Sequence, residues 1–235
     1  MEFVDQPKIL AVDSSSMTGS VALCQGELLV AESLLNVRST HSEKLLKQID
    51  LLLSEAGWQA TDLDLLVAVT GPGSFTGLRI GIATVKGIAQ VLDKPVVGIS
   101  SLEMLAMNVP WACLPICVFL DARKKEVYSQ MFEWRNEGPV ALNKAQVVPP
   151  EKLLNSLEQK VVLVGDGVTQ YRALIDQLPD DTILLPPATS LQPRASQAAW
   201  LALQRYHQGN VSSAAELLPT YIRPSDAELN KSKSK

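Results

Sequence analysis

The sequence has few of the residues that build metal, redox or hydrolytic centres. Only two histidines, His41 and His207, and three cysteines occur among its 235 residues. They form no His-x-x-x-His or Cys-x-x-Cys spacing, so neither a zinc site nor a thiol redox pair is predicted. An odd number of irregularly spaced cysteines indicates reduced thiols, and therefore a cytoplasmic protein.

Two further absences narrow the class of protein. No apolar run approaches the roughly 20 residues of a membrane-spanning helix, and residues 1–8 lack the apolar core of a signal peptide. The formal net charge of −4 argues against a stand-alone nucleic-acid binder. Apolar residues, in contrast, make up 46% of the chain, enough for one large domain or two of about 100 residues.

The hydrophobic pattern predicts an α/β fold built from two similar halves. The first half reads as three strands, a helix from Thr40 with a capping box to Glu43, a strand, and a glycine-rich helix. The second half repeats this order. The predicted strands are 8–12, 18–24, 27–35, 63–69, 95–99, 114–120, 126–134, 140–147 and 161–164, and later helices are 149–157, 169–178 and 196–206.

This repetition predicts two βββαβα lobes. The first lobe covers residues 1–105 and the second 106–210, with residues from about 211 to 225 packed back on the first and a disordered tail at 226–235. The plan resembles the actin-like (ASKHA, ribonuclease H-like) superfamily, in which paired strand-end carboxylates hold a metal–nucleotide. The matching residues are Asp13 and Asp121. Each also suits a turn, and Arg123 and Lys124 are placed to pair with Asp121.

The most distinctive stretch is 70–81, TGPGSFTGLRIG, between a predicted strand and a predicted helix. Such a loop can bind an anion through backbone N–H groups. It lacks the Lys-Ser/Thr of a Walker A motif, and no acidic residue ends the next strand as dinucleotide binding requires. Ser74 lacks a nucleophile elbow and is predicted to cap the helix. The candidate phosphate contacts are Asp13, Ser14, Ser15, Gly71, Gly73, Ser74, Arg79 and Asp121.

Glycines inside the predicted helix need a compensating contact. Gly77 and Gly81 each cost about 1 kcal/mol relative to alanine, and four residues apart they share one face. Without side chains they allow another backbone to approach closely. That backbone belongs either to the helix from Thr40 or to a partner protein.

The stretch 70–81, with LAVDSS at 10–15 and GISSLE at 98–103, resembles the TsaB (YeaZ) family. Residues 40–43 and 221–223 match the same pattern. The resemblance implies a non-catalytic subunit of the bacterial machinery that makes threonylcarbamoyl-adenosine next to the anticodon of tRNA. It implies a heterodimer with the catalytic TsaD, which has a two-histidine metal site, recruitment of the ATPase TsaE, tRNA contact through the complex, and a homodimer when TsaD is absent.

In that family the partner docks on helices of the first lobe. The docking residues implied here are Thr40, His41, Leu45, Ile49, Phe75, Gly77, Leu78, Gly81, Thr84 and Ile88. No cofactor is expected to bind tightly to this chain alone, and ATP or ADP with Mg²⁺ is expected at the interface of the complex. The alternatives are a free-standing actin-like ATPase or glycopeptidase that uses Asp13 and Asp121, and a general RNA-binding module.

Overall fold

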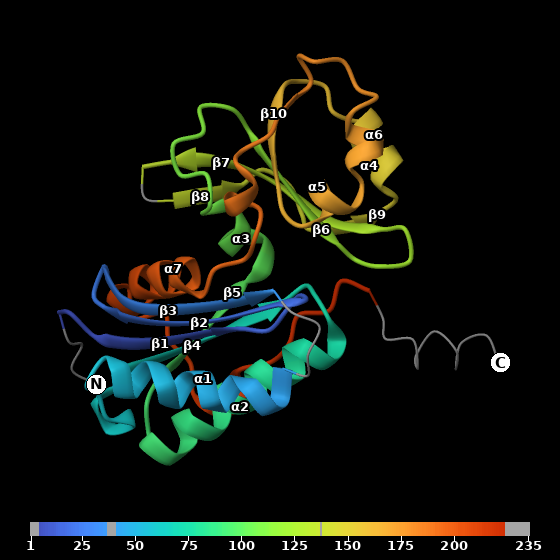
Figure 1. The fold of residues 1–235 in the computed structure, drawn as a ribbon. Helices are drawn as coiled ribbons and strands as arrows, with labels where there is room; N and C mark the ends of the chain where they lie inside the picture. Colours follow the sequence, from blue (N-terminus) through green and yellow to red (C-terminus); the bar gives the residue numbers. More distant parts are fainter. Residues whose placement is uncertain (1–4, 37–40, 137, 224–235) are drawn as a thin grey trace.

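The computed structural model describes residues 5–36, 41–136 and 138–223 (Figure 1). Its first lobe follows the predicted order of elements, with bounds that differ by a few residues. Thr40, the predicted cap, lies outside the described residues, as does the tail at 226–235. The elements are β1 (Lys8–Asp13), β2 (Thr18–Gln25), β3 (Leu28–Asn36), α1 (His41–Glu55), η1 (Ala60–Asp62), β4 (Leu65–Gly71), α2 (Phe75–Leu92), β5 (Val96–Ser100) and α3 (Ser101–Ala106).

The second lobe departs from the prediction at two predicted elements and adds an unpredicted strand, Ile183–Leu184. The strand predicted at 140–147 is two strands, because Asn143 between them accepts a hydrogen bond from Met131 N at 2.8 Å. The helix predicted at 169–178 breaks at Tyr171, which leaves helical geometry and bonds to Asp121. The elements are β6 (Ile116–Asp121), β7 (Val127–Arg135), β8 (Gly138–Ala141), β9 (Gln146–Val148), α4 (Pro150–Asn155), β10 (Val161–Val164), α5 (Gly167–Gln170), α6 (Arg172–Ile175), β11 (Ile183–Leu184), η2 (Ala188–Ser190), α7 (Ala195–His207) and η3 (Ala214–Glu216).

The two sheets have the same topology. The first has the strand order β3-β2-β1-β4-β5, and the second has β8-β7-β6-β10-β11, with β9 paired to β7. In both, the first strand pairs antiparallel with the second and parallel with the strand that follows the first helix. This internal duplication confirms the predicted actin-like α/β fold of two βββαβα lobes.

Strand β1 shows why the first sheet is covered on both faces. Ile9 and Ala11 belong to the core under α7, whereas Leu10 and Val12 belong to the core over α1 and α2. Successive side chains of a strand point to opposite faces, so an unbroken apolar strand needs a layer on each side. Figure 1 shows these layers, with α1 and α2 below the sheet and α7 above it.

The position of α7 corrects the predicted lobe boundary at residue 210. Its alanine-rich face packs on the first sheet, not on the second. Glu32 of β3 fixes the start of the helix by accepting hydrogen bonds from Ser196 N and Arg194 Nε, both at 3.0 Å. The first lobe is therefore built from two separate parts of the sequence.

Helix α3 and the C-terminal segment connect the lobes. Leu102 and Leu105 of α3 lie in the second-lobe core, whereas Met104 packs under α7. From α7 to residue 220 the chain stays on the first lobe, where η3 packs on α2 and Thr220 N donates to Thr70 O at 2.8 Å. Within the described residues, no helix has both the length and the apolar content to cross a bilayer.

Candidate docking surface and strand-end site

The glycine loop packs against the β1–β2 turn of its own chain. A Cβ atom on Gly73 would overlap Ser15 O, one on Gly77 would overlap Ser14 O, and one on Gly81 would overlap Ser14 Oγ. Ser14 Oγ also donates to Gly77 O at 2.8 Å. The missing side chains thus allow a turn more than 60 residues away to close on α2.

This packing occupies donors that an anion would need. Ser74 N donates to Ser15 O at 2.6 Å, and Gly77 N donates to the Ser74 side chain at 3.3 Å. The second bond confirms that Ser74 caps α2. Asp13, Ser14 and Ser15 are almost completely buried beneath the loop. The loop therefore fits poorly as a phosphate cradle, because part of its binding capacity is used within the chain.

The predicted docking residues separate into two groups. Leu45, Ile49 and Leu78 lie in the core between the helices and the sheet. Gly77 and Gly81 are also buried, and the backbone that approaches them is the Ser14 turn, not the helix from Thr40 or a partner protein as predicted. Phe75 is exposed and Thr84 and Ile88 are half-buried, whereas the side chains of Thr40 and His41 lie outside the described structure.

Helix α2 does have an exposed face that could receive a partner, on the side opposite its buried residues. A Cβ on Gly87 would meet no described atom within 4 Å, and the Val91 side chain is 85% exposed. Ala83, one helical turn earlier, is exposed too. These residues recur at intervals of four, so they form one apolar stripe of small side chains. We call Ala83, Gly87 and Val91 the outer stripe of α2.

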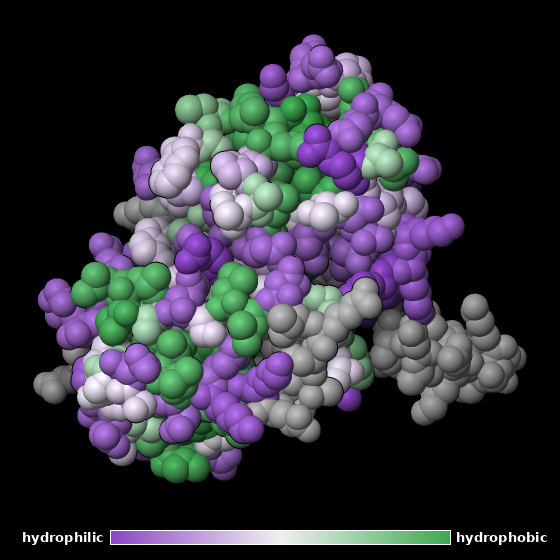
Figure 2. Space-filling model, in the orientation of Figure 1, coloured by the Kyte–Doolittle hydropathy of each residue, from purple (hydrophilic) through white to green (hydrophobic). Residues whose placement is uncertain are grey.

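Further apolar side chains lie exposed on α1. Leu46 and Leu51 are more than half exposed, although neighbouring leucines of the same helix are buried. Figure 2 shows hydrophobic patches, separated by polar side chains, on the face of the first lobe that carries β3 and α1. The exposed glycine of α2 is thus Gly87, not Gly77 or Gly81, although all three are glycines inside the same helix.

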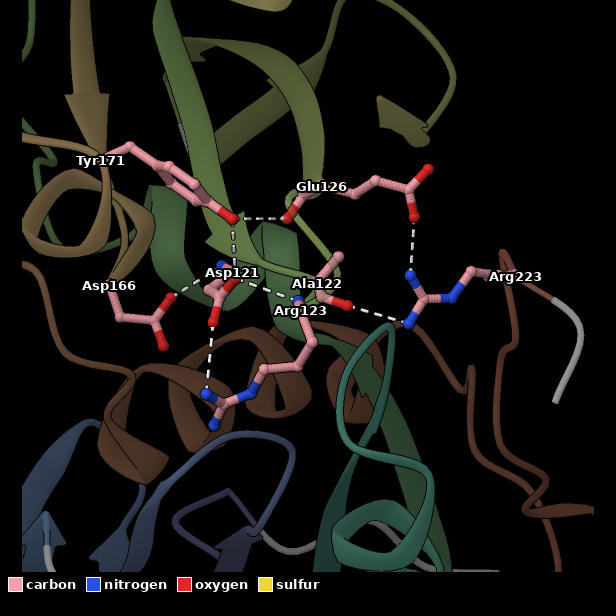
Figure 3. Close-up of polar contacts among 7 residues, drawn as sticks. All are labelled: Asp121, Ala122, Arg123, Glu126, Asp166, Tyr171 and Arg223. Carbon is pink, nitrogen blue, oxygen red and sulfur yellow. Dashed lines mark hydrogen bonds and ion pairs between the residues drawn. The ribbon is translucent and has the colours of Figure 1, made fainter. Parts of the chain in front are cut away.

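The end of β6 forms a dense polar cluster (Figure 3). Asp121 Oδ1 accepts from Arg123 N at 3.0 Å and from the Tyr171 hydroxyl at 3.3 Å. Asp121 N donates to Asp166 Oδ1 at 2.9 Å. The Arg123 guanidinium lies 3.5 Å from the Asp121 carboxylate. These contacts support the interpretation of Asp121 as a residue that stabilises the turn after β6.

Asp166 gives the strand-end site a testable pH dependence. Burial raises the pKa of its carboxyl, and the nearby Asp121 carboxylate adds to the rise. The folded chain binds this proton more tightly than the unfolded chain does. The protonated carboxyl therefore stabilises the fold fully below about pH 4, the pKa of an unfolded aspartate, and this stabilisation is lost as the pH rises through the pKa of the folded state. We expect Asp166→Asn, which keeps an acceptor for Asp121 N, to be more stable than the wild type at pH 7.

Urea unfolding at pH 7 and at pH 3.5 tests this expectation. The gain in stability should shrink at the lower pH, where the aspartate is largely protonated in both the folded and the unfolded chain. Asp180→Asn, an exposed carboxyl in the same lobe, is the matched control and should change stability little. An Asp166→Asn variant that is less stable than the wild type at pH 7 would contradict the argument.

The C-terminal segment contacts both the start of α2 in the first lobe and the β6–β7 turn in the second. Tyr221 stacks on Phe75 with ring centroids 5.0 Å apart. The Arg79 guanidinium lies over the Phe75 ring, 3.8 Å from its centroid. Arg79 Nε also donates to the Tyr221 hydroxyl at 3.2 Å. Two residues later, Arg223 donates to Glu126 Oε2 at 2.7 Å and to Ala122 O at 2.9 Å. Arg79 thus contacts the segment that ties the lobes together.

Metal and thiol chemistry find little support in the geometry. Across residues 5–36, 41–136 and 138–223, no three His, Cys, Asp or Glu side chains are grouped as metal ligands. Burial raises the pKa of the Cys24 thiol to about 12 and that of Cys117 to about 11, so both are protonated at neutral pH. A hollow of about 270 Å³ beside Cys24, lined also by Leu29 and Trp200, lies outside the predicted site.

Together the duplicated sheets and the filled glycine loop define a two-lobed actin-like protein with an exposed helix stripe on its first lobe. A sequence model of the family described as "TsaD: tRNA N6-adenosine threonylcarbamoyltransferase" matches residues 35–231. Two curated relatives are each called "tRNA threonylcarbamoyladenosine biosynthesis protein TsaB". The Bacillus subtilis protein is 29% identical, covering 94% of this chain and 96% of its own, and the Haemophilus influenzae protein is 31% identical, covering 92% and 93%.

A solved structure shows the same likeness in three dimensions. YeaZ from Pseudomonas aeruginosa superposes with a TM-score of 0.80 at 28% identity, over 92% of this chain and 99% of its own. The chain belongs to the TsaB (YeaZ) family.

Proposed function

We propose that this chain is a non-catalytic subunit required for threonylcarbamoyl transfer from threonylcarbamoyl-AMP to the adenosine next to the anticodon of tRNA. It acts in the cytoplasm by dimerising with TsaD, stabilising it and recruiting TsaE. The observation that carries this proposal is the outer stripe of α2, an apolar surface of small side chains on a chain whose relatives are named for tRNA threonylcarbamoyladenosine biosynthesis. Without TsaD, the same stripe pairs two copies of the chain.

The placement of the histidines supports the non-catalytic role. His41 begins α1 and His207 ends α7. These helices pack on opposite faces of the first sheet, so the two residues are separated by the β layer. A two-histidine metal site of the kind expected in TsaD is therefore assigned to the partner.

The nucleotide-binding alternative is weakened by the same geometry. Asp13 is completely buried, and Asp121 is bonded to the β6–β7 turn. Ser74 N and Gly77 N, which would face a phosphate, are bonded within the chain. We therefore assign any ATP or ADP with Mg²⁺ to the interface of the complex. Calorimetric titration of the isolated chain with MgATP would reveal tight binding if the ATPase alternative were correct.

Reconstitution is the direct test of the proposed function. The chain is mixed with TsaD, TsaE, tRNA and threonylcarbamoyl-AMP, and modified adenosine is measured. We expect omission of the chain to lower product formation at least tenfold, and the chain without TsaD to form none. Product formed by the chain alone would show that it is catalytic, whereas undiminished product in its absence would exclude a required role.

A further inference from the structure

The turn between β6 and β7 carries three consecutive basic residues in an unfavourable backbone conformation. Arg123, Lys124 and Lys125 are exposed, with φ angles of 60°, 54° and 60°. Glu126 N donates to Arg123 O at 3.0 Å, which closes a turn whose two central residues both have positive φ. Asn-Gly is the favoured pair in such turns, since a Cβ atom disfavours this conformation. The two lysines are therefore poor choices for the turn itself.

The base of this turn is held rigidly by side chains from several elements. Tyr171 donates to Asp121 and to Glu126 O, and Arg223 donates to Glu126 and to Ala122 O (Figure 3). The cations at the tip are thus presented on a fixed support. Such preorganisation lowers the entropy that is lost when a ligand binds.

The basic turn continues into a second cationic feature. Arg223 at its base is two residues from Tyr221, a separation of about 7 Å along an extended chain. Tyr221 in turn forms the exposed stack with Phe75 and Arg79. Five cations and two aromatic rings from both lobes thus belong to the turn and to the C-terminal segment bonded to it, and the carboxylates of Asp121 and Glu126 pair with Arg123 and Arg223. We call Arg79, Arg123, Lys124, Lys125 and Arg223, with Phe75 and Tyr221, the basic strip.

We propose that the basic strip is a binding surface for an RNA strand, with Lys124 and Lys125 contacting backbone phosphates. This inference rests on the proposed function, which supplies tRNA as the RNA. Lysine and arginine neutralise phosphates, and unpaired bases stack on aromatic rings and guanidinium planes. An acidic protein surface would also attract the lysines but would not use the aromatic stack, which is why the geometry favours RNA.

The test uses Lys124→Asn/Lys125→Gly in the full chain bound to TsaD, with a labelled anticodon stem–loop RNA as the probe. Because Asn-Gly suits the turn, the variant should melt no lower than the wild type. Loss of two phosphate contacts should weaken RNA binding about tenfold near 0.1 M salt. It should also reduce the slope of log affinity against log salt by about 1.5.

Lys144→Gln/Lys160→Gln is the matched control, since it removes the same charge from exposed positions. Asn143, the neighbour of Lys144, accepts a hydrogen bond from Met131, which pairs with Cys117 near the start of β6, away from the turn. Lys160 comes just before β10. Because β10 and β6 are parallel, the start of β10 lies at the other end of the strands from the end of β6, where the turn begins. The control should bind RNA like the wild type. An unchanged affinity or slope in the turn variant, an equal loss in the control, or no RNA binding by the wild-type complex would each overturn the proposal.

Two readouts separate this proposal from the proposed function. If the turn variant loses affinity for TsaD instead of RNA, the strip is a protein-docking surface and the RNA inference is wrong. If RNA binding is unaffected while modification still depends on the chain, only the RNA inference fails. If modification proceeds without the chain, the proposed function fails whatever the RNA affinity.

Discussion

Gly77→Ala is expected to destabilise the chain by roughly 3 kcal/mol, although alanine is the better helix former. The new Cβ would overlap the carbonyl oxygen of Ser14, a backbone atom that cannot rotate away. The buried hydrogen bond from Ser14 Oγ to Gly77 O would also be disturbed. Relieving the overlap requires the β1–β2 turn to move off α2, and this cost exceeds the gain of about 1 kcal/mol in helix propensity.

Gly87→Ala in the same helix is the matched control. Its Cβ meets no described atom within 4 Å, so only the propensity gain remains, and the variant should be stabler by about 0.5 to 1 kcal/mol. Urea unfolding of both variants measures the contrast. If Gly77→Ala unfolds at the wild-type urea concentration and loses only TsaD affinity, the glycine is a docking residue after all.

The second large effect is expected at the outer stripe of α2. Ala83→Glu/Val91→Glu should weaken binding to TsaD at least a hundredfold, because two carboxylates would be buried without partners in an apolar contact. Both positions are exposed in the free chain, so its own stability should change by less than about 0.5 kcal/mol. Calorimetric titration of TsaD into the variant measures the loss.

Val140→Glu/Ala173→Glu provides the matched control for this loss. It makes the same residue changes and adds the same charge at exposed positions of β8 and α6 in the second lobe. The control should bind TsaD like the wild type. Equal affinity of the α2 variant and the wild type would show that TsaD docks elsewhere and would remove the main support for the proposed function.

Local sequence signals predicted the first lobe well. The Ser74 cap is present, and Gly57, a residue type typical of helix C-termini, follows α1 with positive φ, while Trp58 N donates to Leu53 O at 2.9 Å. These features depend on residues a few positions apart, so the sequence determines them directly. The apolar run at 63–69 likewise predicted a strand, and β4 lies there with every residue buried.

Contacts between distant segments were not predictable in the same way. The glycine pattern indicated a close approach on α2 but could not identify Ser14 as the neighbour, because nothing local to either segment encodes the pairing. Gly77 and Gly87 are both helix glycines, yet one is buried and the other is open. Helix α7 has an apolar face that could pack on either sheet. Contacts with residues far away in the sequence place it on the first sheet.

The packing of α7 on the first sheet has a consequence for how the chain folds during its synthesis. As the N-terminal strands leave the ribosome, the face of the first sheet that carries Ile9 and Ala11 lacks most of its cover until Ala195–His207 emerges. The second lobe has a continuous sequence and can complete its core earlier. The N-terminal lobe therefore cannot complete its core before the second lobe has been synthesised. A nascent chain that stalls before residue 195 would expose an apolar β surface to chaperones and to aggregation.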